Sequence, residues 1–277
     1  MSSRDLVLGI GTVRFDGWTA AAARAADERW GGFVRPPSPS HAPDLVAEAV
    51  RGNDEAWLPP WEPGERYRIE AEGRDGTLIV RSYGFNLMRR GDGVWTVAFK
   101  DDGAEPLGRV VDNVARYLVA RLALAHGGIP LHGAAVRRGG HAYVFAGPSR
   151  AGKSTAARVS APAAESLGDD FAVVVPHGHA WATCALPFDN AERAPESPLP
   201  GLVPLSKVCR LYQAQEHAVQ APGAPLAQAS LLSCLAFPWA WPDAIPAAEA
   251  SIDRLVEAGK LVHLHFSPDD GFWKLIE

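Results

Sequence analysis

The chain has 277 residues, 47% of them hydrophobic, and a formal net charge of −5 at pH 7 with a pI near 6.0. That apolar content predicts one large or two small folded domains, and the acidic balance excludes the electrostatic footprint of a nucleic-acid-binding protein. No apolar run reaches membrane-spanning length, and Cys184, Cys209 and Cys234 form no C-x-x-C pair and follow no secretory segment, which predicts reduced thiols in a cytoplasmic protein.

The first hundred residues are rich in β signals. Residues 5–15 alternate as in a strand, and the alanine-rich segment 18–30 predicts a short helix. Proline is frequent over 34–63, which predicts irregular chain interrupted by a brief helix at 44–50. Residues 66–99 hold three β-rich runs separated by two glycine-containing hairpin signals, so we expect an antiparallel meander there.

Strands and helices alternate in the rest of the chain. Apolar residues recur every three or four positions over 105–126, which predicts a helix that ends at Gly127-Gly128. An acidic pair, Asp169-Asp170, opens a buried strand within the segment 167–175. Further strands are predicted at 129–136, 143–147, 180–187, 203–213, 260–266 and 272–276, and further helices at 156–161, 224–237 and 247–259.

A glycine-rich stretch between a strand and a helix has the form G-x-x-x-x-G-K-[ST]. Backbone N–H groups of such a turn bind phosphate oxygens, the lysine adds a positive charge, and the serine hydroxyl can ligate Mg²⁺. A side chain at either glycine would strain the turn or hold the phosphates away from the backbone. The predicted nucleotide-binding residues are Gly147, Pro148, Ser149, Arg150, Ala151, Gly152, Lys153, Ser154 and Thr155.

The acidic pair and a histidine complete the requirements of phosphoryl transfer. Asp169 and Asp170 follow Lys153 closely enough for the chain to return to the sheet beside the glycine-rich turn, and the hairpin before that turn brings His132 to the same side. One carboxylate can bind Mg²⁺ while the other acts as a base toward a hydroxyl. The alternative interpretation is an exposed acidic turn.

Two pairs of histidines have the close spacing that metal ligands can show. His177 and His179 stand at a predicted hairpin tip without a cysteine or carboxylate partner nearby, so exposure is favoured over metal binding. His263 and His265 share one face of a predicted strand, where packing or exposure is favoured over ligation.

The segment 131–175, with LHGAAV, GPSRAGKST and LGDDFAVV in that order, resembles the catalytic core of the HPr kinase/phosphorylase-like proteins and is more distantly similar to ATP-dependent phosphoenolpyruvate carboxykinase. The resemblance implies an α/β (α+β) fold with a mixed β-sheet P-loop kinase core. It also implies that Lys153 contacts the β- and γ-phosphates, Ser154 and Asp170 serve the metal, Asp169 is the catalytic base, and His132 sits beside Asp169.

The sequence departs from that family at several places. Arg150 stands where family members usually carry glycine, Thr155 replaces an acidic residue of the true HPr kinases, and their C-terminal signature has no counterpart. HPr itself is therefore a poor candidate substrate. The likeness is closer to the HPr kinase-like proteins of bacterial peptide-modification and lasso-peptide systems.

The leading hypothesis is an ATP- and Mg²⁺-dependent kinase with two domains. Residues 1–103 would form an antiparallel β-rich α+β region that recognises the acceptor, and 104–277 the catalytic domain. The acceptor would be a hydroxyl of a peptide, a protein or a small molecule; no nucleic acid or membrane partner is expected, and an oligomer is left open. The alternatives are a non-catalytic nucleotide-binding sensor or scaffold and an ATP hydrolase.

Overall fold

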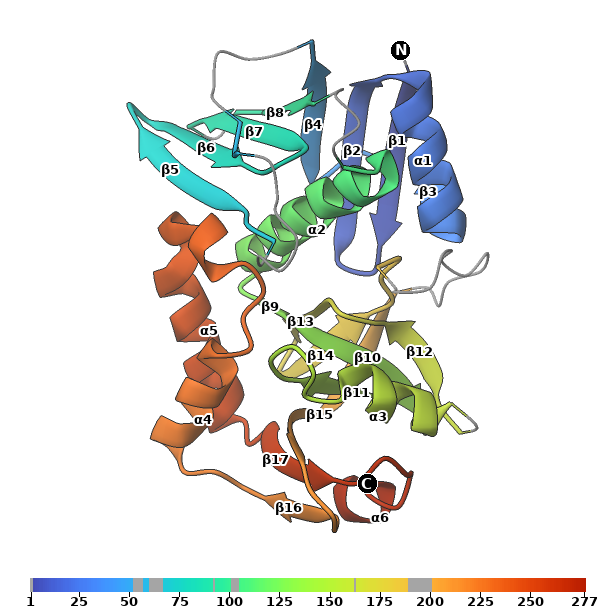
Figure 1. Cartoon of the computed structure of the whole chain (residues 1–277), viewed down its shortest axis with the longest axis vertical. Coiled ribbons are helices and arrows are strands. Elements are labelled where there is room, and N and C mark those ends of the chain that lie inside the picture. The colour runs from blue at the N-terminus through green and yellow to red at the C-terminus, as the bar shows by residue number, and fades with distance from the viewer. Residues whose placement is uncertain are drawn as a thin grey trace.

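Two large mixed β-sheets and the helices packed on them make up the fold (Figure 1). The computed structural model describes residues 2–51, 57–59, 67–91, 93–100, 105–161, 163–188 and 201–277. Within these residues the six α-helices are α1 (Ala20–Trp30), α2 (Leu107–Ala125), α3 (Lys153–Ser160), α4 (Ala224–Leu232), α5 (Ile245–Glu257) and α6 (Trp273–Ile276). Short 3₁₀ helices are η1 (Gly31–Phe33), η2 (Pro238–Ala240) and η3 (Pro242–Ala244).

The N-terminal half forms an eight-stranded sheet in the order β3-β1-β2-β4-β8-β7-β6-β5. Its strands are β1 (Ser2–Leu8), β2 (Gly11–Trp18), β3 (Val34–Arg35), β4 (Leu45–Val50), β5 (Glu70–Arg74), β6 (Thr77–Arg81), β7 (Phe85–Arg90) and β8 (Trp95–Phe99). The meander β5 to β8 is antiparallel, as predicted for 66–99. The sheet as a whole is mixed, because β4 runs parallel to both β2 and β8.

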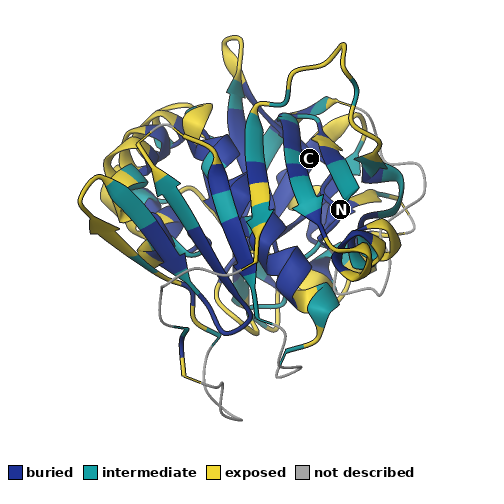
Figure 2. Ribbon diagram, turned by 90° about the horizontal axis from the view of Figure 1, so that it is seen from above, coloured by how far each residue is buried: buried dark blue, intermediate teal, exposed yellow. Residues whose placement is uncertain are grey.

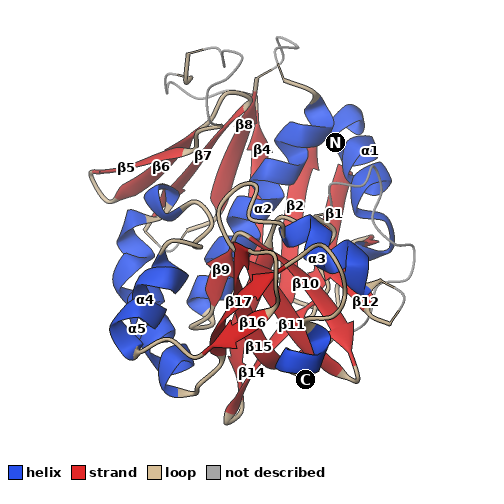
Figure 3. Ribbon diagram, turned by 60° about the horizontal axis from the view of Figure 1, so that its bottom comes forward, coloured by secondary structure: helices blue, strands red, loops and turns tan. Residues whose placement is uncertain are grey.

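The C-terminal half forms a nine-stranded sheet whose main path is β12-β10-β11-β15-β14-β13-β9, with β17 beside β15 and β16 beside β17. Its strands are β9 (Ile129–Leu131), β10 (Gly133–Arg138), β11 (His141–Ala146), β12 (Glu165–Gly168), β13 (Ala172–His177), β14 (Ala180–Cys184), β15 (Leu202–Gln213), β16 (Ala218–Gln220) and β17 (Leu261–Phe266). Figure 3 shows α4 and α5 at one side of this sheet and α3 near β10 and β12.

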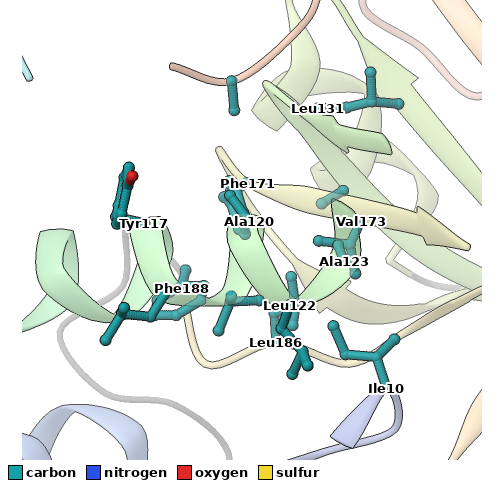
Figure 4. Packing of buried hydrophobic residues seen from close by; sticks show 14 of the residues in the cluster. Ile10, Tyr117, Ala120, Leu122, Ala123, Leu131, Phe171, Val173, Leu186 and Phe188 are labelled. Carbon is teal, nitrogen blue, oxygen red and sulfur yellow. The ribbon is translucent and has the colours of Figure 1, made fainter. Parts of the chain in front are cut away.

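Helix α2 lies between the two sheets and joins their cores. Its apolar residues recur with helical spacing as the sequence predicts, and Gly127, at φ 69°, ends it. Figure 4 shows Leu122 of α2 packed with Leu186 from the C-terminal half and near Ile10 from the β1–β2 turn. Figure 2, seen from above, shows buried residues along most strands and exposed residues mainly in loops; β5, at the end of the N-terminal sheet, is an exception, since four of its five residues are exposed.

Three predicted elements away from the candidate site were wrong. Segment 5–15 is not one strand but the hairpin β1–β2, since a two-residue turn precedes Gly11. Segment 44–50 forms strand β4 rather than a helix, because its insertion between β2 and β8 gives it ladder hydrogen bonds on both sides. Segment 272–276 forms helix α6 rather than a strand, with Trp273 buried against the ring of Tyr143.

A buried carboxylate of α2 accepts hydrogen bonds from two side chains of α1. Asp112 of α2 is 4% exposed and accepts from Arg29 Nε at 2.6 Å and from Trp30 Nε1 at 3.0 Å. Removing one partner of a buried pair leaves the other uncompensated, which costs more than the pair itself contributes. Asp112 therefore constrains the position of α2 relative to the N-terminal sheet.

We expect Asp112→Ala to lower the free energy of unfolding by about 2–4 kcal/mol, because Arg29 and the Trp30 indole lose their acceptor. Urea unfolding followed by tryptophan fluorescence measures this. The control is Asp27→Ala, whose carboxylate is 42% exposed and pairs with Arg4 at the surface; its cost should stay below about 1 kcal/mol. An equal loss of unfolding free energy in the two variants would show that Asp112 does not hold α1 and α2 together.

Candidate functional site

Strand pairing brings three distant segments to one edge of the C-terminal sheet. Strand β10 is antiparallel to both β11 and β12, with Gly133 opposite Ala146 and Ala135 opposite Gly168. The start of β10 therefore lies beside the ends of β11 and β12. His132 precedes β10, the glycine loop (residues 147–152) follows β11, and the acidic pair follows β12, so all three meet there.

The two chain segments that border the site, 129–138 and 165–177, are each interrupted where they lie beside one another. The sequence predicts one strand over 129–136, but the structure divides it at His132 into β9, which pairs with β13, and β10, which pairs with β12. The acidic pair likewise separates β12 from β13. The two interruptions face each other, and His132 and Asp170 meet across them with Nε2 and Oδ1 2.7 Å apart.

The glycine loop has the backbone geometry that its sequence predicts. Gly152 has φ 101°, and a Cβ there would lie 2.6 Å from the Phe266 ring. A Cβ on Gly147 would lie 2.7 Å from Cβ of Ala151 in the same loop. Arg150 also has a positive φ, 65°, and its carbonyl accepts from Gln213 Nε2 at 2.7 Å, so the loop conformation is held by β15.

Lys153 begins α3 and turns back toward the loop. It is 6% exposed, and its Nζ donates to the Pro148 carbonyl at 3.0 Å. Burial lowers the pKa of Lys153, although the carboxylates of Asp170 and Asp169 act in the opposite direction. No side chain among the described residues caps the start of α3, which leaves its first N–H groups for an anion.

Asp170 is held by two cationic or donor groups. His132 lies against Oδ1, and Arg116 of α2 is 3.6 Å from Oδ2. The hydrogen bond with His132 is the main cause that lowers the pKa of Asp170, and the charges of Arg116 and Lys153 add to it. Asp170 has φ 70°, a conformation that aspartate adopts more readily than most residues.

Asp169 is half-buried next to Asp170. Its Oδ1 accepts from the Asp170 backbone N–H at 2.9 Å, and its own N–H donates to the Phe188 carbonyl at 3.1 Å. The expectation placed His132 beside Asp169, whereas the hydrogen bond in the structure joins His132 to Asp170. His132 therefore orients the carboxylate predicted to serve the metal.

Two arginines at the site were missed from sequence. Arg116 stands within the helix predicted at 105–126, and the structure places it at Asp170 with its guanidinium over the Phe188 ring. Arg210 lies within the apolar strand β15, beside the glycine loop. Each shares its element with other charged residues, so the sequence does not single it out, and only the tertiary structure shows what each one faces.

The donors present are those that suit a phosphate-bound Mg²⁺. No group of three or more histidine, cysteine, aspartate or glutamate side chains gathers among the described residues. Mg²⁺ bound to nucleotide phosphates needs only one or two protein oxygens, because phosphates and waters supply the others. Ser154, exposed in the first turn of α3, and Asp170 offer a hydroxyl and a carboxylate of the required kind.

The histidine pairs gain no metal partner within the described part of the chain. His263 is buried and its Nε2 lies 2.8 Å from the Ser230 hydroxyl, while His265 stacks on Tyr212. The three cysteines are free and buried, as predicted. No helix in the described ranges combines the length and apolarity that a bilayer crossing requires.

A cavity of about 490 Å³ lies elsewhere, between the N-terminal sheet, the end of α2 and the start of α5. Arg89, Trp95, Arg121 and Asp243 contribute to its wall. Arg121 donates twice to Asp243, at 2.6 and 2.7 Å. None of the lining residues belongs to the glycine loop or the acidic pair, so this cavity is separate from the candidate site.

Comparison with known proteins gives one family. The family model described as SynChlorMet cassette protein ScmC matches residues 105–245, just over half of the chain. The matched segment contains α2, the glycine loop, the acidic pair and β15. No curated protein matches the sequence.

The pairing of Asp170 predicts a pH-dependent contribution to stability. Because its folded-state pKa is below the ordinary 3.8, the contribution is complete above that pH and is lost as the pH falls through the lowered value. We expect Asp170→Asn to lower the melting temperature at neutral pH, and the gap from wild type to close in strong acid. Thermal unfolding across this pH range tests this, and a gap that does not change with pH would contradict it.

Proposed function

This chain belongs to the ScmC family, and we propose that it is an ATP- and Mg²⁺-dependent phosphotransferase that moves the γ-phosphate to a hydroxyl of a peptide, a protein or a small molecule. The observation that carries the proposal is the meeting of the glycine loop, Lys153 and the two aspartates at one sheet edge. Phosphoryl transfer needs little else from a protein than positioning and charge.

Each side chain has a separate task in the proposed reaction. The loop backbone and Lys153 bind the phosphates, and Ser154 and Asp170 hold Mg²⁺, which supplies charge neutralisation when bound. Asp169 accepts the proton of the acceptor hydroxyl while the hydroxyl oxygen bonds to the γ-phosphorus. The bond between the γ-phosphorus and the β–γ bridging oxygen breaks, and ADP is released. His132 and Arg116 keep Asp170 ionised and oriented.

The arrangement also explains why two adjacent carboxylates can differ in role. Asp170 faces His132, Arg116 and Lys153, which favour its charged form and fix its direction. Asp169 is half-buried, accepts the Asp170 backbone N–H on Oδ1, and carries a negative charge that acts to raise the pKa of Lys153. Asp169 is therefore the better candidate for the base, and Asp170 for the metal.

We expect Asp169→Asn to bind ATP with unchanged affinity but to transfer phosphate about 10²–10⁴-fold more slowly, because the amide cannot accept the proton. Incubation with γ-labelled ATP and candidate acceptors, followed by mass spectrometry, measures transfer. Asp253→Asn, which changes an exposed carboxylate on α5, is the control.

The same assay separates the kinase from its alternatives. Label on an acceptor supports the kinase, label only in free phosphate indicates a hydrolase, and binding without turnover indicates a nucleotide sensor. Wild-type transfer rates in Asp169→Asn would show that Asp169 is not the base.

Lys153→Met should weaken ATP binding at least about tenfold and stabilise the nucleotide-free protein. Burial lowers the pKa of Lys153 below the ordinary 10.5, so at any pH below that lowered pKa the charged side chain reduces the free energy of unfolding. This reduction becomes smaller as the pH rises towards 10.5. Calorimetry measures ATP affinity, and thermal unfolding measures stability. Lys260→Met is the control, because Lys260 also donates to a carbonyl, that of Leu205 at 3.1 Å. Unchanged ATP affinity in Lys153→Met would refute the assignment of the loop.

A further inference from the structure

Arg210 stands at the mouth of the glycine loop on a neighbouring strand. Strand β15 runs parallel to β11, and Arg210 is in register with Ala146, the residue before the loop. Its Nη1 lies 3.3 Å from the position that a Cβ on Gly147 would occupy. A guanidinium is thus placed beside the backbone predicted to hold phosphate.

The guanidinium is fixed in place by packing and not by an acidic partner. Nη1 donates to the Leu211 carbonyl at 2.6 Å, and the group lies over the Tyr212 ring, 4.7 Å from its centroid. Tyr212 in turn stacks on His265 with centroids 5.0 Å apart and planes at 17°. This column of three side chains holds Arg210 in one orientation at small entropic cost on binding.

The charge of Arg210 is not neutralised within the described chain. Its Nε is buried and has no hydrogen-bond acceptor there, and none of the ion pairs found among the described residues includes Arg210. A buried donor without an acceptor is costly, so this half-buried guanidinium, with an unsatisfied Nε beside the glycine loop, indicates that a ligand supplies the missing acceptor and negative charge.

Lys153 lies close enough to Arg210 for the two positive charges to interact. Burial is the main cause that lowers the pKa of Lys153, and the positive charge of Arg210 adds to it. Within the described part of the chain, the Nζ of Lys153 donates its hydrogen bond to the Pro148 carbonyl. Two cations that repel each other would be stabilised by an anion that lies between them.

We propose that Arg210 contacts the phosphate chain of the bound nucleotide and forms with Lys153 a two-cation site for its terminal phosphates. The inference rests on the proposed function for the identity of the ligand, and on the geometry of β15 and the glycine loop for the site itself. Arginine suits this task because its planar donors bind phosphate oxygens in pairs.

The test uses isothermal titration calorimetry of the full chain with ATP and with inorganic tripolyphosphate. Arg210→Met should weaken both ligands about tenfold or more, because it removes charge-assisted hydrogen bonds to phosphate. Arg210→Lys should bind both with intermediate affinity, since it keeps the charge but loses the paired donors.

The matched control is Arg254→Met. The Arg254 guanidinium also lies over a ring, that of Trp181 at 5.8 Å, and donates to a carbonyl, that of Gly127 at 3.2 Å. It belongs to α5 and takes no part in the glycine loop, so ligand affinities should stay within about twofold of wild type. Thermal unfolding checks that each variant is folded. If Arg210→Met does not fold, the affinities of Arg210→Lys decide the test.

The outcomes separate this inference from the proposed function. Wild-type affinity of Arg210→Met for both ligands overturns the role of Arg210 and leaves the kinase proposal standing. Loss of tripolyphosphate binding in Arg210→Met, with no binding of ATP by the wild type, supports the two-cation site and refutes the nucleotide. A wild-type protein that binds neither ligand overturns both.

Discussion

The antiparallel pairing of β10 with β11 on one side and β12 on the other is the constraint on which the candidate site depends. Because Gly133 lies opposite Ala146 and Ala135 opposite Gly168, residues far apart in sequence arrive at one sheet edge. A shift of register by one residue would turn the side chains to the other face and separate His132 from the acidic pair. Strand pairing is interrupted at His132 and at the two aspartates, and the polar side chains of the site stand at these interruptions.

Charge at this edge is organised in two groups. Asp170 is surrounded by His132, Arg116 and Lys153, which lower its pKa, so one carboxylate is well compensated. Arg210 borders the glycine loop and adds to the positive charge at Lys153, and no carboxylate pairs with Arg210 among the described residues. This asymmetry suits the proposed phosphate ligand, which would supply negative charge beside Arg210. Arg116 also ties the site to α2, and through Asp112 to the N-terminal sheet.

Local sequence signals predicted most of the elements and some of the site. Helix α2, the hairpin β10–β11, the long strand β15 and the strand β17 follow from apolar periodicity and turn residues, and the structure confirms them. The glycine loop was recognised because its residue types are fixed by backbone geometry, as Gly152 shows with its positive φ and its contact with Phe266. Strand β4 and helix α6 were mistaken because their own propensities are weak and their neighbours decide their state. Nucleotide binding and the resemblance to HPr kinase-like proteins stay predictions.

The sequence by itself determined the order of the chemical groups along the chain: His132, the glycine loop with Lys153, then Asp169 and Asp170. For the glycine loop it could do so because backbone geometry restricts which residues stand there, whatever surrounds them. Only the tertiary structure decided which groups meet. That His132 faces Asp170, that Arg116 reaches the same carboxylate from α2, and that Arg210 borders the loop depend on strand register and helix packing. These are contacts between residues distant in sequence, and no local pattern encodes them.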